Sequence, residues 1–146
     1  MSDLAARVGD ALDPLEAVRV AWVFGSRVRG QPREDSDLDL AVVYARQLDG
    51  AAREHARRLI VAALTDVLGA VGERADVVDL SDADSAVAFH AVAGGTLALA
   101  RTEAERVEAC VFAWRRYDDE APRRALYRRA AVEVSERGGE GIDGGR

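Results

Sequence analysis

The chain contains no lysine, since all 20 of its basic residues are arginine. This absence excludes mechanisms that depend on a lysine side chain, such as phosphate binding by a Walker P-loop or formation of a Schiff base. The single cysteine, Cys110, cannot form a disulfide within the chain, which is typical of a reducing compartment. No apolar run approaches the roughly 20 residues of a membrane-spanning helix, and the N-terminus does not resemble a secretory signal. Together these absences predict a cytoplasmic protein outside the membrane.

The chain is acidic overall, because its acidic residues outnumber its basic ones. The 146 residues carry a formal net charge of −6, with a pI of about 5.0. Nonspecific nucleic-acid binding draws most of its affinity from neutralised phosphates, so direct binding to nucleic acid is disfavoured. Hydrophobic residues make up 49% of the chain, which is enough for a folded domain of this length.

Hydrophobic patterning predicts strands that alternate with helices. The expected strands are 18–24, 37–44, 74–80 and 96–100. The expected helices are 2–12, 50–70, 81–93, a long helix that starts at 102, and a further helix to about 134 after Pro122. This order predicts an α/β (α+β) domain with a small mixed sheet of about four strands flanked by helices. The domain is expected to span 1–135, and the glycine-rich segment 136–146 is expected to be a flexible tail.

The most informative stretch joins a glycine turn to a pair of acids. Gly25 and Ser26 follow the first expected strand, and Asp37 and Asp39 come after ten intervening residues. Residues two apart on a strand point to the same face, so the two carboxylates are expected to lie side by side, with Leu38 facing a core. Adjacent carboxylates repel each other unless a cation lies between them, and oxygen ligands of this kind suit Mg²⁺. A glycine turn followed by a serine can receive a phosphate group.

A third acid and several arginines extend this pattern. Asp76 and Asp79 both lie on the third expected strand, but their spacing of three places them on opposite faces. Only one should join the site, and Asp76 is preferred; Asp79 also fits a turn at the end of a strand. Arg27, Arg29 and Arg33 in the loop can neutralise phosphate. Three carboxylates with a phosphate-binding turn indicate two-metal phosphoryl or nucleotidyl transfer.

The motif from Gly25-Ser26 to Asp37-x-Asp39 resembles the signature of the DNA polymerase β-like nucleotidyltransferase superfamily. The short chain and the segment VFGSRVRGQPREDSDLDLAVVY resemble members of its minimal nucleotidyltransferase (MNT) branch. The resemblance covers roughly 18–101 and implies the fold of that superfamily. It implies that the aspartates bind two Mg²⁺ ions and that the Gly-Ser pair meets a nucleoside triphosphate. The matching positions are Gly25, Ser26, Asp37, Asp39 and Asp76.

The same resemblance implies a partner and a reaction. Many members of the MNT branch are antitoxins paired with a HEPN-domain ribonuclease toxin, and the active ones transfer AMP from ATP to a toxin tyrosine. The chain has no HEPN motif of its own, so the toxin would be a separate chain in a hetero-oligomer. Two alternatives remain open: an antitoxin that acts by binding and occlusion alone, and a transferase that acts on a small molecule or an RNA end.

One further region is unusual for an acidic chain. Arginines and aromatic residues alternate from Trp114 to Arg129, with Tyr117 and Tyr127 among the arginines. Such a region is a solvated helix face, a docking surface for an acidic partner, since interfaces favour aromatic residues and arginine, or a second support for the triphosphate. The sequence leaves these interpretations open.

Overall fold

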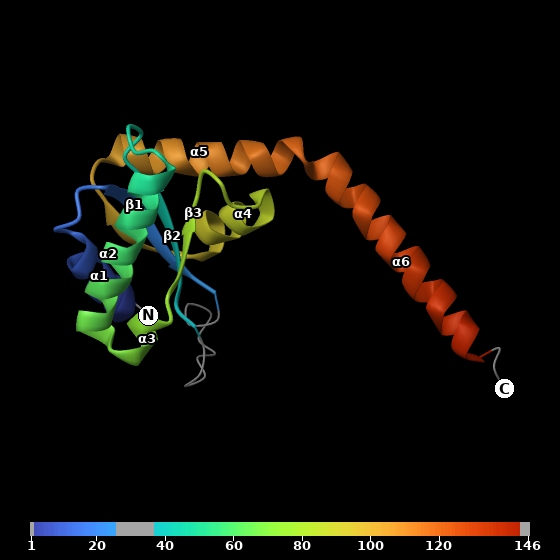
Figure 1. Ribbon diagram of the computed structural model, residues 1–146. Coiled ribbons are helices and arrows are strands. Elements are labelled where there is room, and N and C mark those ends of the chain that lie inside the picture. The colour runs from blue at the N-terminus through green and yellow to red at the C-terminus, as the bar shows by residue number, and fades with distance from the viewer. Residues whose placement is uncertain (1, 26–36, 144–146) are drawn as a thin grey trace.

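The computed structural model describes residues 2–25 and 37–143 (Figure 1). Six helices and four strands are found in these residues. In chain order they are α1 (Ser2–Leu12), β1 (Val18–Phe24), β2 (Asp39–Tyr44), α2 (Gly50–Leu68), α3 (Ala70–Glu73), β3 (Asp76–Asp79), α4 (Ser85–Gly94), β4 (Thr96–Ala100), α5 (Glu103–Asp119) and α6 (Ala121–Asp143). Among these residues, no helix combines the length and the apolar composition that crossing a membrane requires.

The four strands form one mixed sheet in the order β3-β2-β1-β4. β1 is antiparallel to both β2 and β4, whereas β2 and β3 are parallel. Parallel neighbours need a crossover connection, and α2 and α3 lie in the connection between β2 and β3. The predicted fold class, with a small mixed sheet of four strands and flanking helices, is confirmed.

Both faces of the sheet are covered, because alternate side chains of the central strands enter different cores. Leu40 and Val42 of β2 pack with α1 and α2, in a core that includes Val8 and Ile60. Ala41 faces the other way and packs with α4 and α5, in a core that includes Trp22, Ala88 and Ala113. Figure 1 shows the sheet between α2 on one side and α4 on the other. A side chain on β2 or β3 therefore belongs to one of two faces, and its position in the strand decides which.

Local capping explains where the helices and strands differ from the expected boundaries. The expected helix 50–70 ends at Leu68 because Gly69 adopts a φ of 65°, and α3 follows as a separate turn. The expected helix 81–93 begins only at Ser85, where the Asp84 side chain accepts a hydrogen bond from the backbone N–H of Ala86. The other expected elements match to within two residues, apart from the last helix.

The last helix is longer than expected. α6 begins at Ala121, so Pro122 lies in its first turn, where a missing backbone N–H costs nothing. It continues to Asp143, past the boundary expected at 135. Glycine weakens a helix by about 1 kcal/mol per residue without forbidding it, which is why the glycine-rich segment can continue the helix. The flexibility of 136–146 stays a prediction.

Candidate active site

Two acids from neighbouring parallel strands meet at one edge of the sheet. Asp39 is the first residue of β2 and Asp76 is the first residue of β3, and the two are directly paired in the register. Their chain neighbours Leu40 and Val77 both pack into the core beneath α1 and α2. Because side chains alternate along a strand, Asp39 and Asp76 project from the opposite face, the one that carries α4 and α5. The structure thus brings together two of the three acids selected from the sequence.

The third acid lies beside this pair but not on the strand. The sequence predicted that Asp37 belongs to β2, whereas the strand begins two residues later and the Asp37 side chain is exposed. Its Oδ1 lies 3.8 Å from Nε of Arg74, which precedes β3. The backbone N–H of Asp76 donates to the carbonyl of Leu38 at 2.8 Å, and this bond holds the segment that carries Asp37 next to β3.

The negative charges of these acids influence one another. The pKa of Asp39 lies above its ordinary value, first because burial removes the carboxylate from water, and then because Asp76 and Asp37 add negative charge nearby. Each of these effects penalises the ionised form of Asp39. A cation placed against the three carboxylates would relieve the repulsion. The electrostatics of this edge are those of a site that attracts positive charge.

Gly25 lies directly after β1, next to the carboxylate of Asp39. It follows Phe24, which is paired with Asp39 in the antiparallel register, and it has a φ of 88°. A Cβ atom at Gly25 would overlap Oδ2 of Asp39. Glycine is therefore required twice, for its positive φ and for the close approach of the Asp39 carboxylate. The predicted nucleotide contacts Ser26, Arg27 and Arg29 lie outside the described residues, as does Arg33.

A methyl group at Gly25 should damage the site without unfolding the domain. We expect Gly25→Ala to lower nucleotide transfer by at least about 10-fold, because the side chain forces both the turn and Asp39 to shift. The strained φ adds about 1–2 kcal/mol of destabilisation. The transfer rate and the melting temperature are measured for each variant. Gly50→Ala is the control, because a Cβ atom at Gly50 would have no neighbouring atom within 4 Å. Wild-type activity in Gly25→Ala would contradict the role of this turn.

Asp79, the other candidate for the third acid, lies at the far end of β3. It is paired with Val42, about 10 Å along the strand from Asp76. Its carboxylate accepts hydrogen bonds from Arg53 Nη1 at 2.7 Å and from the backbone N–H of Ser81 at 3.0 Å. These contacts fasten the end of β3 to α2 and shape the turn that follows. The structure therefore gives Asp79 a structural partner and leaves Asp76 beside Asp39.

The donor set suits a hard divalent cation. Carboxylate oxygens are the ligands that Mg²⁺ prefers, and the pKa of Asp39 is raised first by burial and then by the neighbouring carboxylates of Asp76 and Asp37. Within the residues that the structure describes, no three acidic, histidine or cysteine side chains are already grouped closely enough to hold a metal ion. Asp37 would have to exchange its contact with Arg74 for the ion. The chemistry of the residues fits Mg²⁺, and the carboxylates would close around it.

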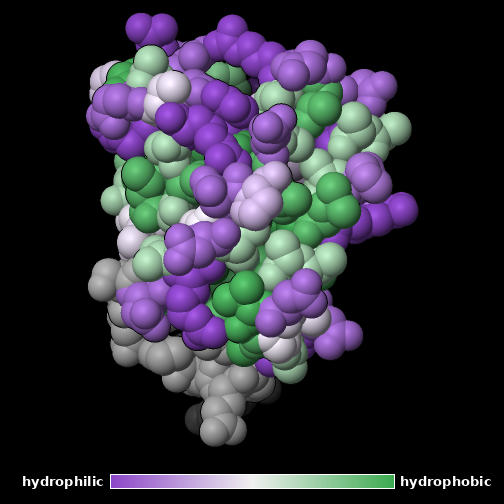
Figure 2. Space-filling model, turned by 90° about the vertical axis from the view of Figure 1, so that its left-hand side faces the viewer, coloured by the Kyte–Doolittle hydropathy of each residue, from purple (hydrophilic) through white to green (hydrophobic). Residues whose placement is uncertain are grey.

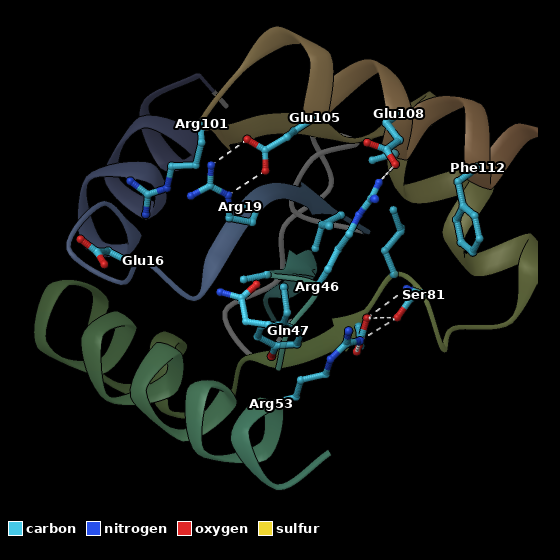
Figure 3. A pocket seen from close by; sticks show the side chains of 16 residues that line it. Glu16, Arg19, Arg46, Gln47, Arg53, Ser81, Arg101, Glu105, Glu108 and Phe112 are labelled. Atoms are coloured by element: carbon cyan, nitrogen blue, oxygen red, sulfur yellow. Dashed lines mark hydrogen bonds and ion pairs between the residues drawn. The ribbon is translucent and has the colours of Figure 1, made fainter. Parts of the chain in front are cut away.

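A separate cavity of about 1040 Å³ lies beyond the opposite end of β2 and β3 (Figure 3). Arginines and acids line it in pairs: Arg19 binds Glu105 at 2.7 Å, Arg46 contacts Glu108, and Asp79 binds Arg53. These pairs join residues far apart in the chain, so no local sequence pattern predicts them. Among the described residues that line the cavity, the positive and negative side chains are equal in number, so its walls have no formal net charge.

Comparison with known proteins identifies the family. The family model described as "Polymerase beta, Nucleotidyltransferase" matches residues 8–104, which include Gly25 and all three acids. The chain belongs to this family. The resemblance seen in the sequence is thereby confirmed, and the acidic edge of the sheet lies within the matched part of this nucleotidyltransferase.

Solved structures of similar fold come from toxin–antitoxin complexes. One is a toxin–antitoxin crystal structure with AMP-PNP; its matching chain has a TM-score of 0.64 and 25% sequence identity, over 87% of this nucleotidyltransferase and 98% of that chain. Another contains the tri-AMPylated Shewanella oneidensis HEPN toxin in complex with an MNT antitoxin, with a TM-score of 0.59 and 24% identity, over 90% of this chain and 99% of the matched one. The second likeness bears on the fold alone.

One curated relative is similar over a shorter stretch. The probable protein adenylyltransferase MntA from Haemophilus influenzae is 42% identical over 53 residues, which are 36% of this nucleotidyltransferase and 46% of that protein. The match thus spans less than half the length of the relative. The similarity therefore concerns this stretch of the two chains only.

Proposed function

We propose that this nucleotidyltransferase is an Mg²⁺-dependent protein adenylyltransferase that moves AMP from ATP to a tyrosine hydroxyl of a HEPN-domain toxin and so acts as its antitoxin. The observation that carries the proposal is the arrangement of Asp39 and Asp76 against Gly25, within a chain of the nucleotidyltransferase family. An acidic edge that meets a glycine turn can hold a metal-bound triphosphate.

The reaction assigns a task to each part of this edge. The tyrosine oxygen bonds to the α-phosphorus of ATP, the bond from that phosphorus to the bridging oxygen of the β-phosphate breaks, and pyrophosphate leaves. Gly25, with Ser26, would receive the triphosphate, and Asp76 would help to activate the attacking hydroxyl. Asp37, Asp39 and Asp76 would hold Mg²⁺, two ions in our proposal, which supplies positive charge to the phosphates and favours loss of the hydroxyl proton.

The relatives support the choice of substrates. One toxin–antitoxin structure of similar fold was solved with AMP-PNP, an analogue of ATP. Another contains a HEPN toxin that carries three AMP groups. The MntA relative from Haemophilus influenzae is a probable protein adenylyltransferase. Each of these statements describes a similar protein, and their agreement favours ATP as the donor and a HEPN chain as the acceptor here.

The proposal is tested by label transfer. The purified chain is mixed with Mg²⁺, a HEPN-domain protein from the same organism, and ATP labelled at either the α- or the γ-phosphate. We expect the HEPN chain to be labelled from the α position only, and tyrosine to carry the label after digestion. Label from the γ position would indicate a kinase. If the toxin is neutralised without any label, and still neutralised by an Asp37→Ala/Asp39→Ala variant, the protein acts by occlusion and the proposal is wrong.

A further inference from the structure

The end of α5 and the part of α6 that follows it carry large apolar and basic side chains, several of which the rest of the described chain leaves exposed. The basic arm is defined here as residues 114–132, from the end of α5 into α6. Its large apolar side chains are strongly exposed, with 58% of Trp114, 65% of Leu126 and 66% of Tyr127 accessible to solvent. In Figure 1, α6 leaves the end of α5 and extends away from the body of the molecule. This surface is built of residue types that a folded domain normally buries.

Among the side chains of α6 that the structure describes, 121–136, those of the first turn contact the body of the molecule. The guanidinium of Arg124 lies 3.4 Å from the ring centroid of Tyr117, and that ring stacks on Phe89 of α4 at 4.1 Å. From residue 125 to residue 136 every side chain is exposed. A helix gains most of its stability from packing an apolar face, so an uncovered helix of this composition is poorly stabilised alone. The arm therefore has the properties of a segment that packs against another molecule.

The charge of the arm points to the chemistry of that molecule. Between Trp114 and Val132 there are six arginines and three acids, in a chain whose net charge is −6. Arginines of the body such as Arg19, Arg53 and Arg101 are paired with carboxylates. Within the described residues, the arginines at 115, 123, 128 and 129 form no ion pair. The free positive charge is concentrated where the apolar side chains are exposed.

We propose that the basic arm is the docking surface for the HEPN partner, and that it fits an acidic surface with apolar contacts on that partner. The inference rests on the proposed function for the partner's identity. Tryptophan, tyrosine and arginine dominate the energetics of protein interfaces, and all three are combined here. Pairing of two arms from two copies is disfavoured, because the same arginines would oppose one another.

The position of the arm suits delivery of an acceptor. α5 packs on the face of the sheet from which Asp39 and Asp76 project, and α6 continues from the end of α5 on the side of α4 (Figure 1). A partner held by the arm is therefore kept on the catalytic side of the sheet. Docking and chemistry use different residues, so they can be separated by mutation.

The experiment compares two arm variants with matched controls. One variant is Arg123→Glu/Arg128→Glu/Arg129→Glu, and the other is Trp114→Ser/Tyr127→Ser. The controls make the same kinds of change on α1 and α2: Arg7→Glu/Arg57→Glu/Arg58→Glu and Leu59→Ser/Val67→Ser. Figure 2 shows the face on the left of Figure 1, which bears these two helices and where hydrophobic and hydrophilic residues are intermixed. Each variant is titrated with the HEPN chain, and AMP transfer is measured as a function of HEPN concentration.

Both arm variants should weaken binding of the HEPN chain by about 30-fold or more and raise the KM for it, with kcat at saturation within about twofold of wild type. The controls should leave affinity and KM unchanged. Folded arm variants with wild-type affinity and KM would overturn the docking proposal while leaving AMP transfer intact. If binding depends on the arm but no AMP is transferred, the docking proposal is supported and the proposed function is contradicted. A change from dimer to monomer in the arm variants alone, with HEPN affinity unchanged, would assign the arm to a second copy and overturn the proposal.

Discussion

Asp39→Asn is expected to lower the rate of AMP transfer by about 10²–10³-fold, while the protein still folds and still binds its partner. The substitution keeps the shape of the side chain and removes its charge. Asp39 is paired with Asp76 in the register of β2 and β3 and is two residues from Asp37 in the chain. Losing one preorganised charge at a reacting phosphate has consequences of this size in enzymes. The measurement is single-turnover transfer with labelled ATP, with Asp66→Asn on the exposed side of α2 as the matched control.

The same variant should be more stable than the wild type at neutral pH. A carboxyl whose pKa is raised in the folded state loses stability as pH rises from the unfolded pKa through the folded one. Near pH 7 the wild type carries this full penalty, and asparagine does not. Below about pH 3.9 the carboxyl is protonated in both states, so the advantage of the variant should vanish. Thermal melts over this range check the sign, and a variant that is less stable at pH 7 would contradict a penalised Asp39.

Local patterns were enough to predict most elements of the fold. The strands at 18–24 and 96–100 match β1 and β4, because each is an apolar, β-branched or alternating run between turn residues. The start of α5 follows from Thr102, whose hydroxyl accepts from the backbone N–H of Glu105. In each case the signal lies within a few residues of the boundary that it determines.

Features that depend on tertiary contacts were not accessible in this way. The alternation of side chains along a strand places Asp76 and Asp79 on opposite faces of the sheet. It does not predict which of the two lies beside Asp39, because that depends on the parallel register of β2 and β3. The position of Asp37 outside β2 likewise involves long-range contacts: its ion pair with Arg74 and the hydrogen bond from the backbone N–H of Asp76 to the carbonyl of Leu38. The ion pair of Arg19 with Glu105 joins residues 86 positions apart. Long-range contacts of this kind leave no periodic trace in the sequence.

The two acids of β3 should respond to substitution in opposite ways. We expect Asp76→Ala to lower transfer by about 100-fold or more with little change in stability, because the Asp76 side chain is exposed beside Asp39. We expect Asp79→Ala to keep transfer and to destabilise the fold by about 1–3 kcal/mol, since Arg53 and the turn at Ser81 lose their acceptor. Transfer rates and denaturant unfolding of the two variants, measured side by side, test both statements.

This pair of substitutions also tests where on the sheet the chemistry takes place. Asp76 and Asp79 share one short strand, so a general disturbance of β3 would affect both variants alike. Loss of transfer in Asp76→Ala alone assigns catalysis to the edge that holds Gly25 and Asp39. The reverse result, with transfer lost only in Asp79→Ala, would move the reaction to the end of β3 where Arg53 and the large cavity lie. In that case the repulsion around Asp39 would need another explanation, because an acidic edge that takes no part in binding a cation gains nothing from three adjacent carboxylates.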